Sequence, residues 1–260
     1  MEWRERNGVR WLEAKMRGAH AAFTTRIGGV SEPPFDSLNL GVLTDDDEAA
    51  VRENRERLAG ALGLDPSRVP IALQVHRAEI VEHAGPQAPS PFAEPGSPLP
   101  EADGHVVTAP ELTPLVFVAD CLPIALHGPR GLALLHCGWR PLAAGIVAKG
   151  AAAVGATEAA IGPGIGPCCY EVGEEVRDAF SDLGEGIGAG RMLDLPEVAR
   201  RLLAAAGVRR VESAGLCTSC EAELFFSHRR DGGRTGRQAG LAWRNPIEFA
   251  TGEEPLPRVA

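Results

Sequence analysis

The sequence predicts an α+β fold in a single domain spanning residues 1–260, with mixed or antiparallel sheets packed together and helices outside. Strand-like and helix-like segments follow one another without the strict βαβ alternation of a parallel sheet. Between Ala119 and Arg140, two apolar runs (122–126 and 132–135) flank His-Gly-Pro-Arg, which is typical of a β-hairpin. A chain of 260 residues with 44% hydrophobic residues is long enough to bury a sizeable core.

The first part of the chain alternates short strands with one clear helix. An acidic first turn and Gly63 mark the two ends of this helix. In order, we expect a strand or short helix at 9–17, a strand at 21–26, the helix at 45–62, and a strand or strand pair at 71–83. In the last of these, period-2 alternation places His76 opposite the apolar face of Leu73 and Val75.

Residues 84–102 contain six prolines and cannot sustain regular structure. We expect a surface loop, and its position between His76 and Cys121 makes it a candidate lid.

The remainder of the chain supplies most of the predicted strands. In order, we expect strands at 105–108 and 115–119, the hairpin, a helix at 139–154, a strand at 157–161, helices at about 171–183 and at 195–206, and a strand at 208–215. The Gly-rich segment 162–167 lacks the Lys-Ser/Thr of a P-loop, so it is a weak phosphate motif.

The hairpin brings two potential metal ligands together. With the turn centred between Gly128 and Pro129, Cys121 lies opposite His136, close enough for a thiolate and an imidazole to share one ion. The alternative is a buried cysteine and a polar histidine at strand ends, and a one-residue slip would reverse the face. The predicted helix after His136 would also place free N–H groups beside the pair, where they could bind an anion and lower a thiol pKa.

Charge and hydropathy exclude several partners. The net charge of −9 and the pI near 5.3 argue against nucleic acid and anionic membranes. The charged first sixteen residues do not resemble a signal peptide, and no later run approaches the ~18 apolar residues that span a bilayer. We therefore expect a cytoplasmic protein. Its oligomeric state cannot be predicted from the sequence.

Six cysteines outside any disulfide framework are best interpreted as thiols, metal ligands or buried small residues. Cys217 and Cys220 form a single CxxC, so a structural zinc there would need ligands from elsewhere in the chain. Residues 225–237, a turn predicted to lie between strands, carry four arginines and form either a solvated basic turn or an anion clamp.

Six segments, in this order, resemble the laccase-domain family. They are TTRIGGVS (24–31), QVH (74–76), ADCLP (119–123), HCGWR (136–140), GPGIG followed by CYEV (162–172), and FFSHRRDGGRTGR (225–237). Members of that family are described as multicopper polyphenol oxidoreductases, peptidoglycan editing factors and purine nucleoside phosphorylases, and the fold is like that of cysteine hydrolases. The resemblance implies a metal site of His76, Cys121 and His136. Arg77, Cys137 and Pro141 depart from the family pattern and leave substrate preference open.

Two histidines and one cysteine without a fourth protein ligand are typical of a catalytic zinc with an open position. The resemblance then implies a zinc-dependent purine nucleoside enzyme, with phosphorolysis of adenosine, inosine or methylthioadenosine and deamination of adenosine. Its substrates would be a purine nucleoside and phosphate. The candidate catalytic residues are Cys121, His136, Asp120 and Arg140. The candidate substrate or phosphate contacts are Arg26, Asn39, Arg140, Arg229 and Arg230.

Three alternatives stay open. Seven scattered histidines without an HxH motif argue against a true multicopper polyphenol oxidase, although a single copper ion could bind a His/His/Cys set. A hydrolase that edits peptidoglycan precursors would use Cys121 as nucleophile and His136 as base. A non-enzymatic metal-binding protein is the third alternative.

Overall fold

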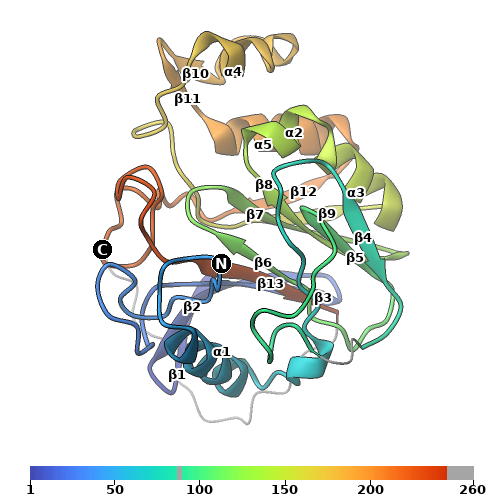
Figure 1. Ribbon diagram of the computed structural model, residues 1–260. Helices are drawn as coiled ribbons and strands as arrows, with labels where there is room; N and C mark the ends of the chain where they lie inside the picture. Colours follow the sequence, from blue (N-terminus) through green and yellow to red (C-terminus); the bar gives the residue numbers. More distant parts are fainter. Residues whose placement is uncertain (87–89, 245–260) are drawn as a thin grey trace.

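The computed structural model describes residues 1–86 and 90–244 and confirms the α+β class. Two sheets stack face to face, with helix α1 (Glu48–Leu62) on one side and helices α2, α3 and α5 on the other (Figure 1). Three apolar clusters fill the interfaces of this helix–sheet–sheet–helix sandwich. The C-terminal part of the proposed 1–260 domain and part of the proline-rich segment, residues 87–89, lie outside the described residues.

The first sheet is antiparallel throughout, with strand order β1-β2-β3-β13-β6. Its strands are β1 (Glu2–Arg6), β2 (Val9–Met16), β3 (Ala19–Thr24), β6 (Leu115–Val118) and β13 (Gln238–Trp243). Strand β13 lies inside this sheet and is buried along its whole length. A strand was expected after the 225–237 turn, but its bounds were not predicted, because QAGLAW is a short run without alternation and its strand character comes from its two neighbours.

The second sheet is mixed, with strand order β12-β9-β7-β8-β5-β4. Its strands are β4 (Ile80–His83), β5 (Gly104–Val107), β7 (Leu122–Gly128), β8 (Gly131–Cys137), β9 (Glu158–Ile161) and β12 (Arg210–Ser213). The hairpin is confirmed, but its register is two residues from the predicted one, since Gly128 pairs with Gly131 and His136 pairs with Pro123. A shift of two preserves the strand face, so Cys121 and His136 remain diagonal neighbours.

Alternation along β8 separates two neighbouring residues of the candidate site. Leu134 belongs to the cluster between the two sheets, whereas Leu135 and Cys137 belong to the cluster under the outer helices. His136 therefore projects from the same face as Leu134, and Cys137 is a buried core residue with no access to that side.

Helix α1 begins at Glu48, three residues later than predicted, because the Asp47 side chain accepts the N–H groups of Ala49 and Ala50 as an N-cap. Gly63 ends it in the left-handed conformation, as predicted.

Two predicted helices are broken. Residues 139–154 form α2 (Trp139–Ala143) and α3 (Ile146–Val154), because Gly145 adopts a φ of 82° between them. Residues 171–183 form only α4 (Glu174–Asp178) and the 3₁₀ turn η2 (Ser181–Leu183), followed by the short ribbon β10 (Gly188–Ala189) and β11 (Met192–Leu193). Helix α5 (Leu195–Ala205) agrees with the prediction. With only five residues, α2 does not supply the anion-binding helix end expected after His136.

The predicted strand 71–83 is also mostly wrong. Only Ile80–His83 is a strand, and η1 (Pro66–Arg68) precedes an irregular segment that leads to it. His76 has a φ of 58°, so it lies in a bend and not on a strand face. Residues 225–237 likewise form turns that lead into β13, without a strand before them. In the part of the chain that the structure describes, no helix is long and apolar enough to cross a bilayer.

Candidate metal centre and active site

His76, Cys121 and His136 meet in one pocket of about 680 Å³. One donor atom of each lies within 4.8 Å of the others. The rings of His76 and His136 meet edge to face, with 4.8 Å between centroids. The predicted ligand set is therefore brought together by three segments that are far apart in the sequence.

Local backbone geometry places each donor. Asp120 has a φ of 90°, which turns the chain sharply between β6 and β7 and presents the half-buried Cys121 at the start of β7. His136 projects from β8 into the space at the end of the two sheets. The chain at His76 and the turn at Asp120 both hold non-glycine residues at positive φ, a conformation that costs free energy and is found preferentially at functional sites.

Asp103 organises both histidines. Its carboxylate lies 2.8 Å from His136 Nδ1 and accepts the backbone N–H groups of Val75, His76 and Arg77 at 2.7–3.2 Å. Because a carboxylate accepts only, Nδ1 of His136 carries the proton and Nε2 is left for the Cys121 side. A fully buried carboxylate that orients a histidine in this way is typical of the surroundings of a metal ligand.

The same contacts shift the protonation of the pair. Burial raises the pKa of the Cys121 thiol, but the charge of His136 and hydrogen bonds from both imidazoles outweigh it and lower the pKa to about 6. Burial lowers the pKa of His136, but Cys121 and Asp103 raise it to about 9. The site therefore favours a thiolate, which is the form of cysteine that binds metal or acts as a nucleophile.

These residues fit a single transition-metal ion by their chemistry and their space. Two imidazoles and a thiolate suit zinc or copper, and they leave a coordination position open to the pocket. A Cβ atom on Gly138 would lie 2.9 Å from Cys121 Sγ and 3.6 Å from His76 Cδ2, so glycine is needed to leave room for these side chains.

Asp120 lines the pocket, yet its carboxylate is already engaged. It accepts the Thr218 hydroxyl and the Arg229 backbone N–H, both at 2.7 Å, and the residue is only 8% exposed. Since both oxygens hold structural partners, Asp120 is placed to fix the turn before Cys121.

Four arginines line the pocket: Arg55, Arg140, Arg229 and Arg237. Arg140 stacks on Trp139, and Arg229 stacks on Tyr170 while donating to the Glu171 carbonyl at 2.8 Å. Burial raises the pKa of Tyr170 to about 12, with a contribution from the negative charge of Cys121 that Arg229 and Arg140 oppose. Burial lowers the pKa of Arg237, while Cys121 and Asp120 act against that shift. Positive charge is therefore concentrated around the tyrosine and the thiolate.

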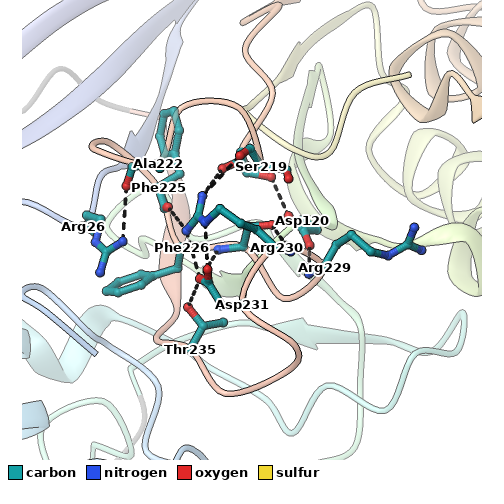
Figure 2. Close-up of polar contacts among 12 residues, drawn as sticks. Arg26, Asp120, Ser219, Ala222, Phe225, Phe226, Arg229, Arg230, Asp231 and Thr235 are labelled. Atoms are coloured by element: carbon teal, nitrogen blue, oxygen red, sulfur yellow. Dashed lines mark hydrogen bonds and ion pairs between the residues drawn. The ribbon is translucent and has the colours of Figure 1, made fainter. Parts of the chain in front are cut away.

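Three predicted substrate contacts lie away from the pocket lining: Arg26, Asn39 and Arg230. Arg26 binds the Asp36 carboxylate. Figure 2 shows that Arg26 also binds the Ala222 carbonyl, and that Arg230 binds Asp231 and the Phe225 carbonyl within its own loop. Asn39 is fully buried, with its amide donating to Thr44 and Asp46 and accepting from the Arg237 N–H. These polar side chains hold loops together.

Three residues of the site were not predicted: Asp103, Tyr170 and Arg237. Strands β5 and β8 pair antiparallel with Gly104 opposite Leu135, which carries Asp103 across from His136. That pairing was a usable signal, because both strands were predicted. Tyr170 and Arg237 reach the pocket through irregular loops, and the sequence shows no period that points them there.

The fold and the site define a class of protein: a four-layer α+β domain with a His/Cys/His donor set in an arginine-lined pocket. Residues 20–245 match the family described as multi-copper polyphenol oxidoreductase laccase, and the chain belongs to this family.

Similar proteins cover most of the chain. A purine nucleoside phosphorylase from Pseudomonas aeruginosa is 40% identical over 238 residues, covering 86% of this chain and 92% of its own length. The purine nucleoside phosphorylase YfiH of Escherichia coli (strain K12) is 37% identical over 246 residues, covering 90% and 96%. The crystal structure of YlmD from Geobacillus stearothermophilus superposes with a TM-score of 0.83 at 34% identity, covering 94% of this chain and 98% of the other.

Proposed function

We propose that this protein is a zinc-dependent purine nucleoside enzyme that cleaves the glycosidic bond of adenosine, inosine or methylthioadenosine with phosphate, and that also deaminates adenosine. One observation carries the proposal: a His/Cys/His donor set and four arginines line the same pocket. The names of the relatives add the substrate class, since those proteins are called purine nucleoside phosphorylases.

The pocket provides complementary surfaces for the two parts of such a substrate. Its apolar wall includes Leu73, Phe117 and Ile165, on which a purine ring can pack. Arg140 and Arg229 present guanidinium groups, which bind phosphate oxygens through paired N–H donors. The proposal therefore assigns anion binding to Arg140, Arg229 and Arg237 and leaves out Arg26, Asn39 and Arg230.

His76, Cys121 and His136 would hold the metal ion. Asp103 keeps the proton on His136 Nδ1 and fixes the bend that carries His76, so both rings keep their orientation without the cost of ordering them at each turnover. When bound, zinc with an open position supplies Lewis-acid chemistry and lowers the pKa of a water molecule. Copper would suit the same donors, and metal analysis of the purified protein decides between them.

The proline-rich segment forms part of the pocket wall. The described part of the proline-rich segment contributes Pro91, Gly96 and Leu99 to the lining, and Arg55 anchors it by donating to the Pro91 and Phe92 carbonyls. We propose that residues 84–102 act as a lid. Unchanged proteolytic susceptibility of this segment on adding nucleoside would contradict that role.

One observation favours a second candidate, a cysteine hydrolase acting on peptidoglycan precursors. Cys121, His136 and Asp103 lie in the order of a nucleophile, a base and an orienting carboxylate. The two candidates make opposite predictions for metal removal. A hydrolase would keep its activity in chelator, and its Cys121 would react with iodoacetamide. In the zinc enzyme the ion would protect this thiol.

The decisive experiment incubates zinc-loaded protein with adenosine, with and without phosphate, and separates the products by chromatography. We expect adenine and ribose 1-phosphate only when phosphate is present, and inosine from the deamination reaction in both samples. Arg140→Met should raise KM for phosphate about 10-fold or more, because a charge-assisted contact contributes about 1.5–3 kcal/mol. The matched control is Arg52→Met, an exposed arginine on α1 that pairs with Glu48. No product above the Cys121→Ala background would refute the nucleoside assignment.

A further inference from the structure

Four of the six cysteines gather at a second place, outside the residues that line the pocket. Cys168 and Cys169 follow the Gly-rich segment after β9, and Cys217 and Cys220 form the CxxC that had no partner in the sequence. All four sulfur atoms lie within 4.8 Å of one another. Cys168 and Cys169, which lie 52 and 51 positions before Cys220 in the chain, therefore supply the ligands that the CxxC lacks.

We propose that Cys168, Cys169, Cys217 and Cys220 form a second metal site, a closed all-thiolate site for a soft divalent ion such as zinc. In tetrahedral ZnS₄ the Zn–S distance of about 2.3 Å sets sulfur atoms about 3.8 Å apart. Cys220 Sγ lies 3.4 Å from both Cys168 Sγ and Cys169 Sγ, so the thiols need only small adjustments to reach this spacing.

The backbone around the cluster is arranged to support a thiolate. The N–H of Gly166 points at Cys217 Sγ over 3.2 Å, and Cys217 pairs with Gly164 in an isolated bridge. Backbone N–H groups of Gly166, Cys220 and Ser219 are directed at the Cys217 sulfur. A CxxC whose first sulfur receives backbone N–H donors from the following residues is pre-ordered for a metal ion.

A disulfide accounts for this geometry less well than a metal ion. Cys220 lies at the same distance from two cysteines, so one disulfide would use one of them and leave the other two sulfurs of the cluster as thiols. A metal ion uses all four at once. Because no coordination position would stay open, the site would be structural, in contrast to the pocket.

The cluster is also linked to the pocket through two short bonds. The Ile165 N–H donates to the Asp120 carbonyl at 2.8 Å, and the Thr218 hydroxyl donates to the Asp120 carboxylate at 2.7 Å. Ile165 precedes Cys168 in the Gly-rich loop, and Thr218 lies inside the CxxC. An ion that ties the two loops together would therefore hold the turn in front of Cys121.

The test measures zinc per chain in the full protein after zinc loading and gel filtration. We expect about two ions in the wild type and about one in both His76→Ala and the double variant Cys168→Ser/Cys220→Ser. Cys168 and Cys220 are exposed, so their replacement should leave the fold intact. Ser219→Ala, inside the CxxC but without a ligand atom, is the matched control and should keep both ions.

Cobalt substitution makes the test independent of folding in the cysteine variants. His76→Ala/Cys121→Ala keeps all four clustered cysteines, and Co²⁺ in it should give the intense visible and charge-transfer bands of a tetrahedral all-sulfur site. Absence of these bands overturns the proposal, as does an unchanged zinc content in Cys168→Ser/Cys220→Ser. A disulfide within the cluster, found by mass spectrometry in freshly purified protein, would also refute it. The outcome does not depend on the nucleoside activity.

Discussion

The protein brings cysteine sulfur atoms together with other possible metal ligands at two places. The two places differ in their donor atoms, in their access to a cavity and in the groups that support the donors. In the pocket, one sulfur and two imidazoles converge on a cavity, and a buried carboxylate orients both histidines. In the cluster, four sulfurs face one another at the surface, supported by backbone N–H groups. Three donors beside a cavity leave room for a substrate, whereas four donors enclose the ion. We therefore expect changes in the pocket to affect turnover and changes in the cluster to affect stability.

The largest effect should come from Cys121→Ala. This change removes the central donor and its negative charge, and we expect kcat/KM for phosphorolysis to fall on the order of 1,000-fold or more, since a catalytic metal contributes several kcal/mol. Zinc content should fall by about one ion per chain. Steady-state kinetics and metal analysis on the same preparation measure both. Retained activity in this variant would remove the distinction between the two sites.

Asp103→Asn tests whether the pocket depends on its buried carboxylate. Asparagine keeps the size of the side chain but loses the charge and presents an NH₂ group where the carboxylate now accepts N–H donors. We expect metal affinity or activity to fall about 10–100-fold, the usual range for a residue that orients a metal ligand. Zinc titration against a competing chelator measures the affinity. If zinc affinity is unchanged while kcat falls, Asp103 acts in the chemistry of a cysteine–histidine pair, which would favour the hydrolase alternative.

Much of this arrangement followed from the sequence, and the parts that did not have identifiable causes. Apolar periodicity and the His-Gly-Pro-Arg turn were enough for the hairpin, and a register error of two residues left Cys121 and His136 on the correct side. The bend at His76 was missed because its positive φ is stabilised by Asp103, a contact 27 positions away. The bounds of strand β13 and its place inside the sheet were missed because its pairing partners are β3 and β6, at the other end of the sequence and in its middle.

Contacts between distant segments also decided which parts of the site could be predicted from the sequence. The CxxC motif indicated a half-site, but only the folded loops bring Cys168 and Cys169 to it. Of the four arginines expected to contact phosphate, Arg140 and Arg229 line the pocket, whereas Arg26 and Arg230 do not. Arg26 and Arg230 are instead used to hold loops, whereas Arg229, adjacent to Arg230, lines the pocket. Neighbouring residues of identical type thus acquire different roles from the direction in which the backbone turns.

Gly138→Ala tests how closely the pocket is packed around its donors. The added Cβ would lie 2.9 Å from Cys121 Sγ, while the backbone φ of −77° suits alanine, so the effect is steric alone. We expect zinc affinity to fall about 10-fold, equivalent to about 1.4 kcal/mol, as the sulfur moves aside. The control is Gly60→Ala in α1, where an added Cβ meets no atom within 4 Å and helix propensity should raise stability by about 0.5–1 kcal/mol. Equal zinc affinity in the two variants would show that the pocket tolerates a displaced sulfur.

The smallest effect on turnover, and the sharpest contrast with Cys121→Ala, is expected from Cys220→Ser. Loss of one of four ligands should weaken the surface ion, and an ion that binds only the folded chain contributes about 2.7 kcal/mol at a concentration 100 times its Kd. For a chain of this size the unfolding midpoint should fall on the order of 5–10 °C. Wild-type protein in a chelator should unfold at the temperature of the variant or below it, because the chelator removes the cluster ion and also the pocket ion. Turnover, measured well below the midpoint in zinc-loaded protein, should change by less than about 10-fold, since the cluster contributes no donor to the pocket and is linked to it through Ile165 and Thr218. Ser219→Ala supplies the baseline for both measurements.

If Cys220→Ser reduced turnover as strongly as Cys121→Ala, the cluster would belong to the catalytic machinery. The assignment of chemistry to one site and stability to the other would then fail.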